Sequence, residues 1–189
     1  MVETGGFVPF AILTRHLSSN VDSVQTLERL LSAIDEIAEE LPVIFPVHPR
    51  TQERLKEARV KHHPHLRLIP PVGYLDFLCL LHRSQFVLTD SGGIQEETTA
   101  LGVPCLTLRE NTERPITVTE GTNQLVGQDT KKIVNAAREI FGGKAKEGKV
   151  PRLWDGHAAE RIVEILLREG PRNTKVNGTK AAALRTEWI

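Results

Sequence analysis

Short, mostly apolar runs alternate along the chain with longer segments whose apolar residues recur at helical spacing. The runs that we expect to be buried strands are 10–14, 43–48, 66–69, 85–90, 104–108 and 122–127. The segments that we expect to be helices are 22–41, 50–60, 74–83, 94–101, 131–141 and 156–168. Asp22 would cap the start of the first helix, and Pro42 would stop it.

This alternation predicts an α/β fold. Strands that are apolar at nearly every position must be covered on both faces, which is the pattern of a parallel sheet with helices on each side. The chain of 189 residues is long enough for one such domain with a sizeable core. We therefore expect one domain over 1–170 and a polar tail, either mobile or docked elsewhere, over 171–189.

The polar joints that follow the expected strands indicate one ligand-binding edge. In an open parallel sheet, ligands bind outside the carboxyl ends of the strands. The joints at that edge are 14–20, 47–51, 70–74, 89–97 and 109–115. We expect these five joints to line one crevice.

The central joint, LTDSGGIQEETTALG (88–102), passes from a strand through a turn into a helix. Ser91, Gly92 and Gly93 precede the free N–H groups at the positive end of that helix, where an anion such as phosphate is favoured. Glycine also lets a ligand approach the backbone closely. The alternative is a tight turn in which Ser91 only caps the helix. The HPR and TERP strings on the same edge favour phosphate binding.

Two glutamates on the same helix conflict with a site for phosphate alone, because a carboxylate repels a diphosphate. One turn into the helix, Glu96 or Glu97 could accept hydrogen bonds from ribose hydroxyls, as the acidic residue of a dinucleotide fold does. Alternatively, the two glutamates only complement the positive end of the helix dipole. The spacing of the residues does not decide between these roles.

Histidines and arginines near the same edge are candidates for contacts with a diphosphate. His16 and His48 each follow an expected strand, and a histidine with a pKa near 6.5 either carries charge or donates a neutral hydrogen bond. Arg50 and Arg114 each offer a guanidinium fork to phosphate. The alternatives are ordinary hydrogen-bonded histidines at strand ends and exposed surface arginines.

Composition and charge narrow the class of protein. The formal net charge is zero, which argues against a general binder of nucleic acid or of membrane surfaces. No apolar run reaches the ~18 residues of a membrane span, and the first residues lack the basic region of a secretion signal. Cys79 and Cys105 lie in apolar runs, so we expect two buried reduced thiols and a cytoplasmic protein.

Motifs for several other chemistries are absent or lie in the wrong context. Neither GxGxxG nor GxxxxGK[ST] occurs, so the sequence supports neither a nicotinamide cofactor nor a Walker-type phosphate loop. The TDSGG string resembles a serine-protease sequence, but here it joins a strand to a helix, and GxSxG is absent. The HHPH string at 62–65 lacks the spacing of a zinc site, so we expect a solvated loop, no metal and no cofactor.

Four stretches of the chain carry a family resemblance. They are PVIFPVHPRT, VGYLDFL, FVLTDSGGIQEETTALGVPCLTLRENTERPITVTEGTNQLVG and LWDGHAAERIVEIL. These stretches, which fall between about Phe10 and Leu167, resemble the C-terminal domain of the non-hydrolysing UDP-N-acetylglucosamine 2-epimerases. The resemblance implies a UDP-binding, Rossmann-like domain over 1–170, which is the C-terminal half of a glycosyltransferase type B fold.

The resemblance also implies a reaction and a set of residues. The family interconverts UDP-N-acetylglucosamine and UDP-N-acetylmannosamine: UDP is eliminated to leave a glycal and returns after the C2 proton is replaced on the other face. The residues implied to bind the UDP-sugar are Tyr74 and Phe77 at the uracil, Ser91, Gly92 and Gly93 at the diphosphate, Glu97 at the ribose and Arg114 near the sugar phosphate. His16 and His48 would act as catalytic residues near the pyrophosphate and the reacting sugar.

The chain also departs from the family pattern. The family's proteins are longer, and their N-terminal domain carries the carboxylates that move the C2 proton. Where the family commonly has His-Arg, this chain has His16 and Leu17 after Arg15, and that family arginine serves a regulatory substrate site in some relatives. We therefore expect half of an enzyme that needs the N-terminal domain as a partner and forms a homodimer at full length. The alternatives are the nucleotide-binding domain of a glycosyltransferase and a non-catalytic UDP-sugar-binding module.

Overall fold

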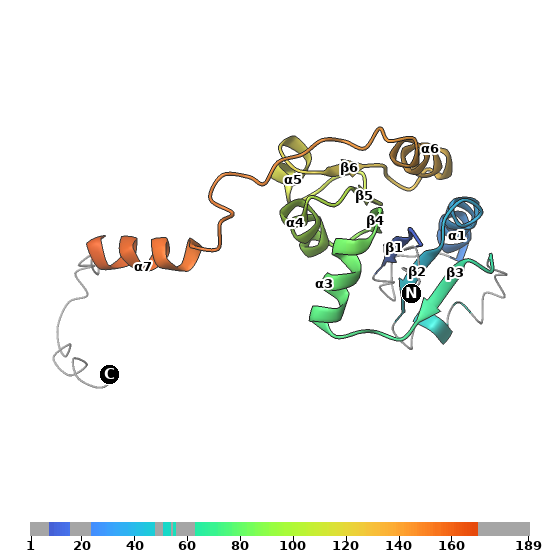
Figure 1. Cartoon of the computed structure of the whole chain (residues 1–189), viewed down its shortest axis with the longest axis horizontal. Helices are drawn as coiled ribbons and strands as arrows, with labels where there is room; N and C mark the ends of the chain where they lie inside the picture. Colours follow the sequence, from blue (N-terminus) through green and yellow to red (C-terminus); the bar gives the residue numbers. More distant parts are fainter. Residues whose placement is uncertain (1–7, 16–23, 48–50, 54, 56–62, 170–189) are drawn as a thin grey trace, which may run out of the picture. The chain divides into compact units, whose positions relative to one another are not determined.

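The computed structural model describes residues 8–15, 24–47, 51–53, 55 and 63–169 (Figure 1). The chain forms two compact units, Met1–Arg152 and Leu153–Ile189. The first unit contains the sheet and every candidate site residue that the structure describes.

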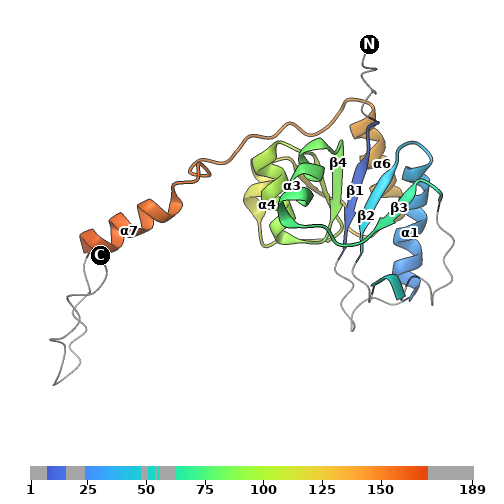
Figure 2. The same cartoon turned by 60° about the horizontal axis from the view of Figure 1, so that its bottom comes forward.

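Parallel strands form the centre of the first unit. In its described part the sheet has six strands in the order β3-β2-β1-β4-β5-β6. They are β1 Ala11–Thr14, β2 Val43–Pro46, β3 Leu66–Ile69, β4 Phe86–Thr89, β5 Cys105–Thr107 and β6 Asn123–Leu125. The chain runs outward from β1 to β3, returns to β4 beside β1, and runs outward again to β6 (Figures 1 and 2). The strand order therefore reverses between β1 and β4, which is where such sheets bind their ligands.

Helices cover both faces of the sheet. Helices α1 (Val24–Ala38) and α6 (Thr130–Phe141) lie on one face, and α3 (Tyr74–Arg83) and α4 (Gly92–Leu101) lie on the other (Figures 1 and 2). The short helix α5 (Pro115–Thr119) lies beside α4. The predicted α/β architecture with helices on both faces is thus confirmed.

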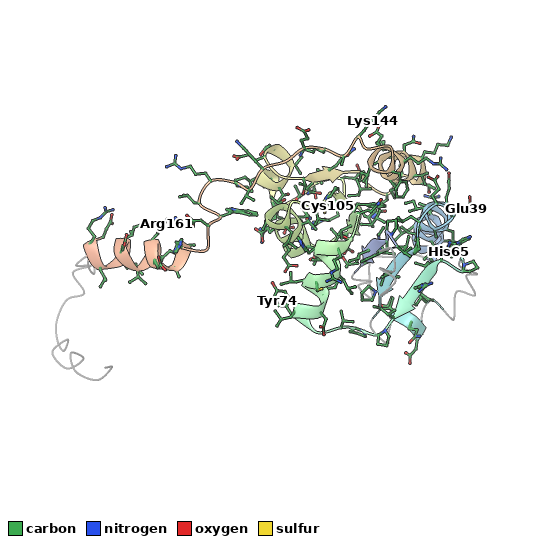
Figure 3. The ribbon with its side chains drawn as sticks, viewed as in Figure 1. Glu39, His65, Tyr74, Cys105, Lys144 and Arg161 are labelled. Atoms are coloured by element: carbon green, nitrogen blue, oxygen red, sulfur yellow. The ribbon has the colours of Figure 1, made fainter. Side chains whose placement is uncertain are left out.

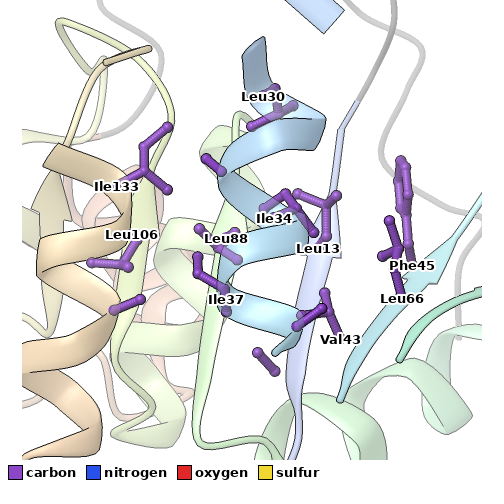
Figure 4. Packing of buried hydrophobic residues seen from close by; sticks show 14 of the residues in the cluster. Leu13, Leu30, Ile34, Ile37, Val43, Phe45, Leu66, Leu88, Leu106 and Ile133 are labelled. Atoms are coloured by element: carbon purple, nitrogen blue, oxygen red, sulfur yellow. The ribbon is translucent and has the colours of Figure 1, made fainter. Parts of the chain in front are cut away.

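Successive side chains of a strand point to opposite faces of the sheet, so each strand contributes to the core on both faces. In β1, Leu13 joins the larger cluster beneath α1 and α6 (Figure 4). Its neighbour Ile12 joins the smaller cluster beneath α3 and α4. In β4, Leu88 and Val87 divide in the same way. Burial of each such side chain contributes roughly 1.5–3 kcal/mol to folding, so the sheet is stabilised from both sides.

The segment that follows α6, residues 144–152, runs back along α5 and β6, and we call it the return segment (Figure 1). The ammonium group of Lys146 donates hydrogen bonds to the carbonyl oxygens of Val118 and Asn123. The amide of Lys149 donates to the carbonyl oxygen of Glu120 at 2.9 Å. Because its charge is partly desolvated, the pKa of Lys146 lies below its ordinary value. The return segment is therefore tied to the α5–β6 connection.

The second unit contains α7 (Ala158–Glu169). Its start is held by Asp155, which accepts hydrogen bonds from the Arg161 guanidinium and from the amide of His157. These contacts, that of Arg161 foremost, lower the pKa of Asp155 to about 2. The large apolar side chains of α7 are exposed: Ile162, Val163, Ile165, Leu166 and Leu167. Among the described residues, no helix has both the length and the apolar character needed to cross a bilayer.

Several sequence predictions need correction. Cys105 is buried and Cys79 is exposed, so the prediction of two buried thiols is wrong for Cys79, although both thiols are free. Cys79 lies one turn after the exposed Leu75, on the outward face of α3. Helix α4 begins at Gly92, two residues before the predicted start, and α5 was not predicted.

Other predictions fall on residues outside the described part of the chain. The predicted cap Asp22 and most of the predicted helix over 50–60 lie there, although 51–53 and 55 are helical. The predicted tail, 171–189, also lies there, so the domain boundary at 170 stays a prediction.

Candidate functional site

Two threonines join the strand ends at the point where the sheet order reverses. The hydroxyl of Thr14, the last residue of β1, donates a hydrogen bond to the hydroxyl of Thr89, the last residue of β4, at 2.7 Å. Thr89 is fully buried and its hydroxyl oxygen also accepts the amide of Ser91 at 3.0 Å. The exit of the chain from β4 toward α4 is therefore fixed by side-chain hydrogen bonds.

The first turn of α4 lies at this edge, and the side chain of its N-cap residue does not cap it. Ser91 occupies the N-cap position in an extended conformation, but its side chain makes no capping hydrogen bond. The first N–H groups of a helix have no intrahelical partner, and without a side-chain cap they remain available to a ligand. The geometry therefore favours an anion over the alternative in which Ser91 only caps the helix.

Gly92 and Gly93 both lie inside α4, yet the fold does not require glycine at either position. Neither residue has a positive φ, and a β-carbon would meet only ordinary contacts, 3.8 Å from Cγ of Arg114 at Gly92 and 3.9 Å from Oγ of Ser91 at Gly93. Glycine costs roughly 0.5–1 kcal/mol relative to alanine within a helix. Two such residues at the start of α4 leave room for a ligand to approach the backbone closely.

Glu97 lies one turn further along α4 and has one oxygen ready to accept a hydrogen bond. The Tyr74 hydroxyl donates to its Oε1 at 3.4 Å, a long hydrogen bond. Its Oε2 is buried and has no hydrogen-bond partner among the described residues. Desolvation raises the pKa of Glu97, the neighbouring Glu96 raises it further, and the Tyr74 hydroxyl opposes the shift. A hydroxyl of a bound molecule would satisfy this carboxylate.

Arg114 brings positive charge to the same end of α4. Its Nε lies 2.9 Å from Oε1 of Glu96, and both side chains are about two-fifths exposed, at 43% and 41%. The N–H is not directed at that oxygen, so Nε has no hydrogen-bond partner among the described residues although the charges are in contact. Exposed pairs of this kind contribute about 0–1 kcal/mol, so a phosphate can displace Glu96 at little cost.

Tyr74 and Phe77 both lie in the first turn of α3, but they face different surroundings. Tyr74 is exposed (Figure 3), and its hydroxyl donates the hydrogen bond to Glu97. Phe77 packs against the smaller core cluster, and its amide already donates to the carbonyl oxygen of Gly73 at 2.8 Å. The structure therefore brings Tyr74 to the candidate site and uses the Phe77 side chain in the core.

Three candidates for the diphosphate, His16, His48 and Arg50, lie outside the described residues. Of the HHPH string, His63 and His65 are described, and their rings meet edge to face at 5.0 Å. The described part of the chain holds no group of three side chains suited to a metal ion.

Sequence reasoning missed the polar side chains that support the site from beneath. Gln95, Thr98 and Thr99 occupy the inward face of α4, where apolar residues would be expected, and all three are buried. A helix whose inward positions are polar is the signal that could have revealed them, because buried polar groups must find hydrogen-bond partners.

The candidate site thus combines three kinds of group along one edge. Open amides and Arg114 suit a diphosphate, Glu97 suits a pair of hydroxyls, and Tyr74 offers an exposed aromatic ring. This combination suits a nucleoside diphosphate.

The chain is similar to known proteins over most of its length. The model of the UDP-N-acetylglucosamine 2-epimerase family matches residues 2–167. The UDP-N-acetylglucosamine 2-epimerase of Methanocaldococcus jannaschii is 45% identical over 163 residues, which are 83% of this chain and 44% of that protein. The UDP-2,3-diacetamido-2,3-dideoxy-D-glucuronate 2-epimerase of Pseudomonas aeruginosa is 39% identical over 160 residues, 84% of this chain and 44% of that protein.

Solved structures show the same similarity. The crystal structure of the M. jannaschii UDP-GlcNAc 2-epimerase in complex with UDP-GlcNAc and UDP has a TM-score of 0.74 at 44% identity, and the match covers 85% of this chain and 46% of that chain. The structural comparison confirms the predicted fold class, one Rossmann-like half of a glycosyltransferase type B fold. The chain spans about half the length of the curated relatives it matches.

Proposed function

The chain belongs to the UDP-N-acetylglucosamine 2-epimerase family, and from that membership we propose that it supplies the UDP-binding half of an enzyme that interconverts UDP-N-acetylglucosamine and UDP-N-acetylmannosamine. The observation that carries the proposal is the open first turn of α4, with two glycines that the fold does not need. Such a turn lets phosphate oxygens reach backbone amides.

Each part of UDP has a place in this proposal. Ser91, Gly92 and Gly93 hold the diphosphate with their backbone, and Arg114 turns from Glu96 to the phosphate nearest the sugar. Glu97 accepts the ribose hydroxyls with the oxygen that has no partner among the described residues. The uracil lies against the start of α3, where Tyr74 is exposed and the backbone around Phe77 passes.

The half-site would assist departure of UDP rather than proton transfer. When the bond between the sugar and UDP breaks, negative charge grows on the diphosphate, and oriented amides with a nearby guanidinium stabilise that charge. We propose that His16 and His48 act at the pyrophosphate and the reacting sugar, as catalytic residues of this half. The carboxylates that exchange the C2 proton belong to the partner domain in this proposal.

A titration of UDP into the isotope-labelled chain, followed by NMR, tests the proposal. We expect a dissociation constant on the order of 0.1–1 mM, about 4–5.5 kcal/mol, because the site forms only one wall of the cleft. Gly92→Ala should keep the fold, since a β-carbon there has room, and should weaken UDP binding at least about tenfold. Gly92→Val should abolish binding. Equal shifts in the wild type and in Gly92→Val would contradict the proposal.

The proposal also specifies which sugar is attached to UDP. In this proposal the described site residues bind the nucleotide and do not select the sugar. The P. aeruginosa relative is named for a different UDP-sugar from the M. jannaschii one. The higher identity to the M. jannaschii enzyme favours UDP-N-acetylglucosamine. Competition between UDP and each UDP-sugar in the same titration distinguishes the two.

The proposal also covers the location of the protein in the cell and its partners. We propose a cytoplasmic enzyme whose full-length form is a homodimer, with the N-terminal domain as the necessary partner and no partner among nucleic acids or membranes. The two free thiols, Cys79 and Cys105, agree with a reducing compartment.

A further inference from the structure

A cluster of polar side chains lies beneath the first turn of α4. Gln95 on α4, Asn123 on β6, and Thr117 on α5 are fully buried. The Asn123 amide nitrogen donates to Oε1 of Gln95 and to the hydroxyl of Thr117, each at 3.1 Å. The hydroxyl of Thr107 on β5 donates to Oδ1 of Asn123 at 2.7 Å. The cluster therefore links α4, α5 and two strands.

One end of the cluster holds the backbone at the start of α4. The side-chain amide of Gln95 donates to the carbonyl oxygen of Ser91 at 3.2 Å. Ser91 is the N-cap residue whose following amides face the proposed diphosphate. Gln95 thus ties the position of that turn to the interior of the protein.

The other end of the cluster holds the backbone of Arg114 from both sides. The Thr112 hydroxyl donates to Oε1 of Gln95 at 2.6 Å and accepts the Arg114 amide at 2.9 Å. The Thr117 hydroxyl donates to the Arg114 carbonyl oxygen at 2.7 Å. Because the amide and the carbonyl of Arg114 are both hydrogen-bonded, the position of its α-carbon, from which the side chain extends, is fixed.

A role in folding alone explains these bonds less well. Replacing both partners of a buried hydrogen bond by apolar groups of the same shape is nearly neutral for stability, so packing does not require this network. The bonds of Gln95 and Thr112 end on Ser91 and Arg114, which approach the same ligand from two sides. A small error in the separation of such groups weakens binding strongly.

We propose that Thr112 and Gln95 are positioning residues that fix the separation between the open first turn of α4 and Arg114 for a diphosphate. This inference rests on the proposed function, and it adds residues that touch no ligand themselves. Thr112 is the link between the two halves of this arrangement, because one hydroxyl serves both Gln95 and Arg114.

Thr112→Val removes that hydroxyl at nearly constant size, and Thr112→Ser restores it. We expect Thr112→Val to weaken UDP binding at least about tenfold while leaving the weaker binding of uridine unchanged within about twofold. Uridine keeps the base and ribose contacts but has no phosphate. Thr112→Ser should return UDP affinity to the wild-type value. Thr119→Val, an exposed threonine on α5, is the matched control and should change neither affinity.

A second measurement uses the free protein and needs no ligand. Hydrogen exchange of the Arg114 amide should accelerate in Thr112→Val and remain slow in Thr112→Ser, because that amide donates to the Thr112 hydroxyl. Unchanged exchange in Thr112→Val, or equal loss of uridine and UDP affinity, would overturn the inference. If the wild type binds no UDP, the proposed function fails, and the exchange data still decide whether Thr112 holds Arg114.

Discussion

The carboxylate of Glu97 is subject to two opposing effects on its protonation. Burial raises its pKa, yet the proposed ribose contact uses its charged form. The cost of keeping that charge is reduced by the Tyr74 hydroxyl on one oxygen, while the other oxygen has no partner among the described residues. A ligand with two hydroxyl groups could donate hydrogen bonds to this carboxylate, including one to the oxygen that has no partner among the described residues.

The raised pKa of Glu97 leads to a prediction about stability. The folded state holds this proton more tightly than the unfolded state, so the free energy of unfolding should fall as pH rises from 4.5 through the raised pKa. Glu97→Gln should remove that part of the slope. Urea unfolding at several pH values measures it, with Glu147→Gln, an exposed site, as the control. An identical pH slope in wild type and Glu97→Gln would contradict the assignment.

The two cysteines should differ sharply in reactivity. Cys105 is fully buried and its pKa is raised to about 11, mainly by desolvation, whereas Cys79 is exposed on α3. Because the thiolate is the reactive form, a thiol reagent should modify one thiol per native chain, and Cys79→Ser should abolish that reaction. In denaturant two thiols should react. Rapid modification of Cys105 in the native protein would show that β5 opens readily.

At the scale of elements, apolar periodicity predicted most of the fold. β3 and α3 match their predicted ranges, because each is bounded by clear changes in polarity. Helix α5 was missed since a five-residue helix that starts at Pro115 shows no repeat. The early start of α4 was missed because glycines are poor helix formers, and a ligand role explains their presence better than propensity does.

Positions after strands and the family resemblance together predicted the residues of the candidate site, but not the side chains that support them. Ser91, Glu97 and Arg114 were found from their places after strands and from the family resemblance. Thr112 and Asn123 were not found, because their role depends on contacts between segments far apart in the chain. No local pattern carries that information.

The return segment offers a test of packing between elements. A β-carbon at Gly148 would lie 2.5–2.7 Å from backbone atoms of Gly121 and Thr122, closer than real contacts allow. We expect Gly148→Ala to destabilise the protein by about 1–3 kcal/mol, because backbone cannot move aside as a side chain can. Thermal unfolding measures the loss, and Glu147→Ala, an exposed neighbour, should change little. Wild-type stability in Gly148→Ala would show that the return segment packs elsewhere.

At the scale of the whole molecule, we propose that the chain supplies the nucleotide site and that the N-terminal domain supplies the carboxylates for proton exchange. Glu96 and Glu97, the glutamates at the site, are engaged with Arg114 and Tyr74. We expect the 189-residue chain alone not to exchange the C2 proton of UDP-N-acetylglucosamine in deuterated water, as followed by NMR. Adding the N-terminal half of a relative as a separate polypeptide is the positive arm. Exchange at enzyme-like rates by the chain alone would contradict this division of labour.

The attachment of the return segment has a mechanical consequence. The Lys146 and Lys149 contacts end on α5 and the start of β6, a few residues from Arg114 and just before the second unit begins. A pull on the chain beyond residue 152 would therefore load the α5–β6 connection before it loads the rest of the sheet. We expect tension from that end to reach Arg114 first, so a force on the C-terminal unit should weaken the diphosphate binding that we propose for this residue.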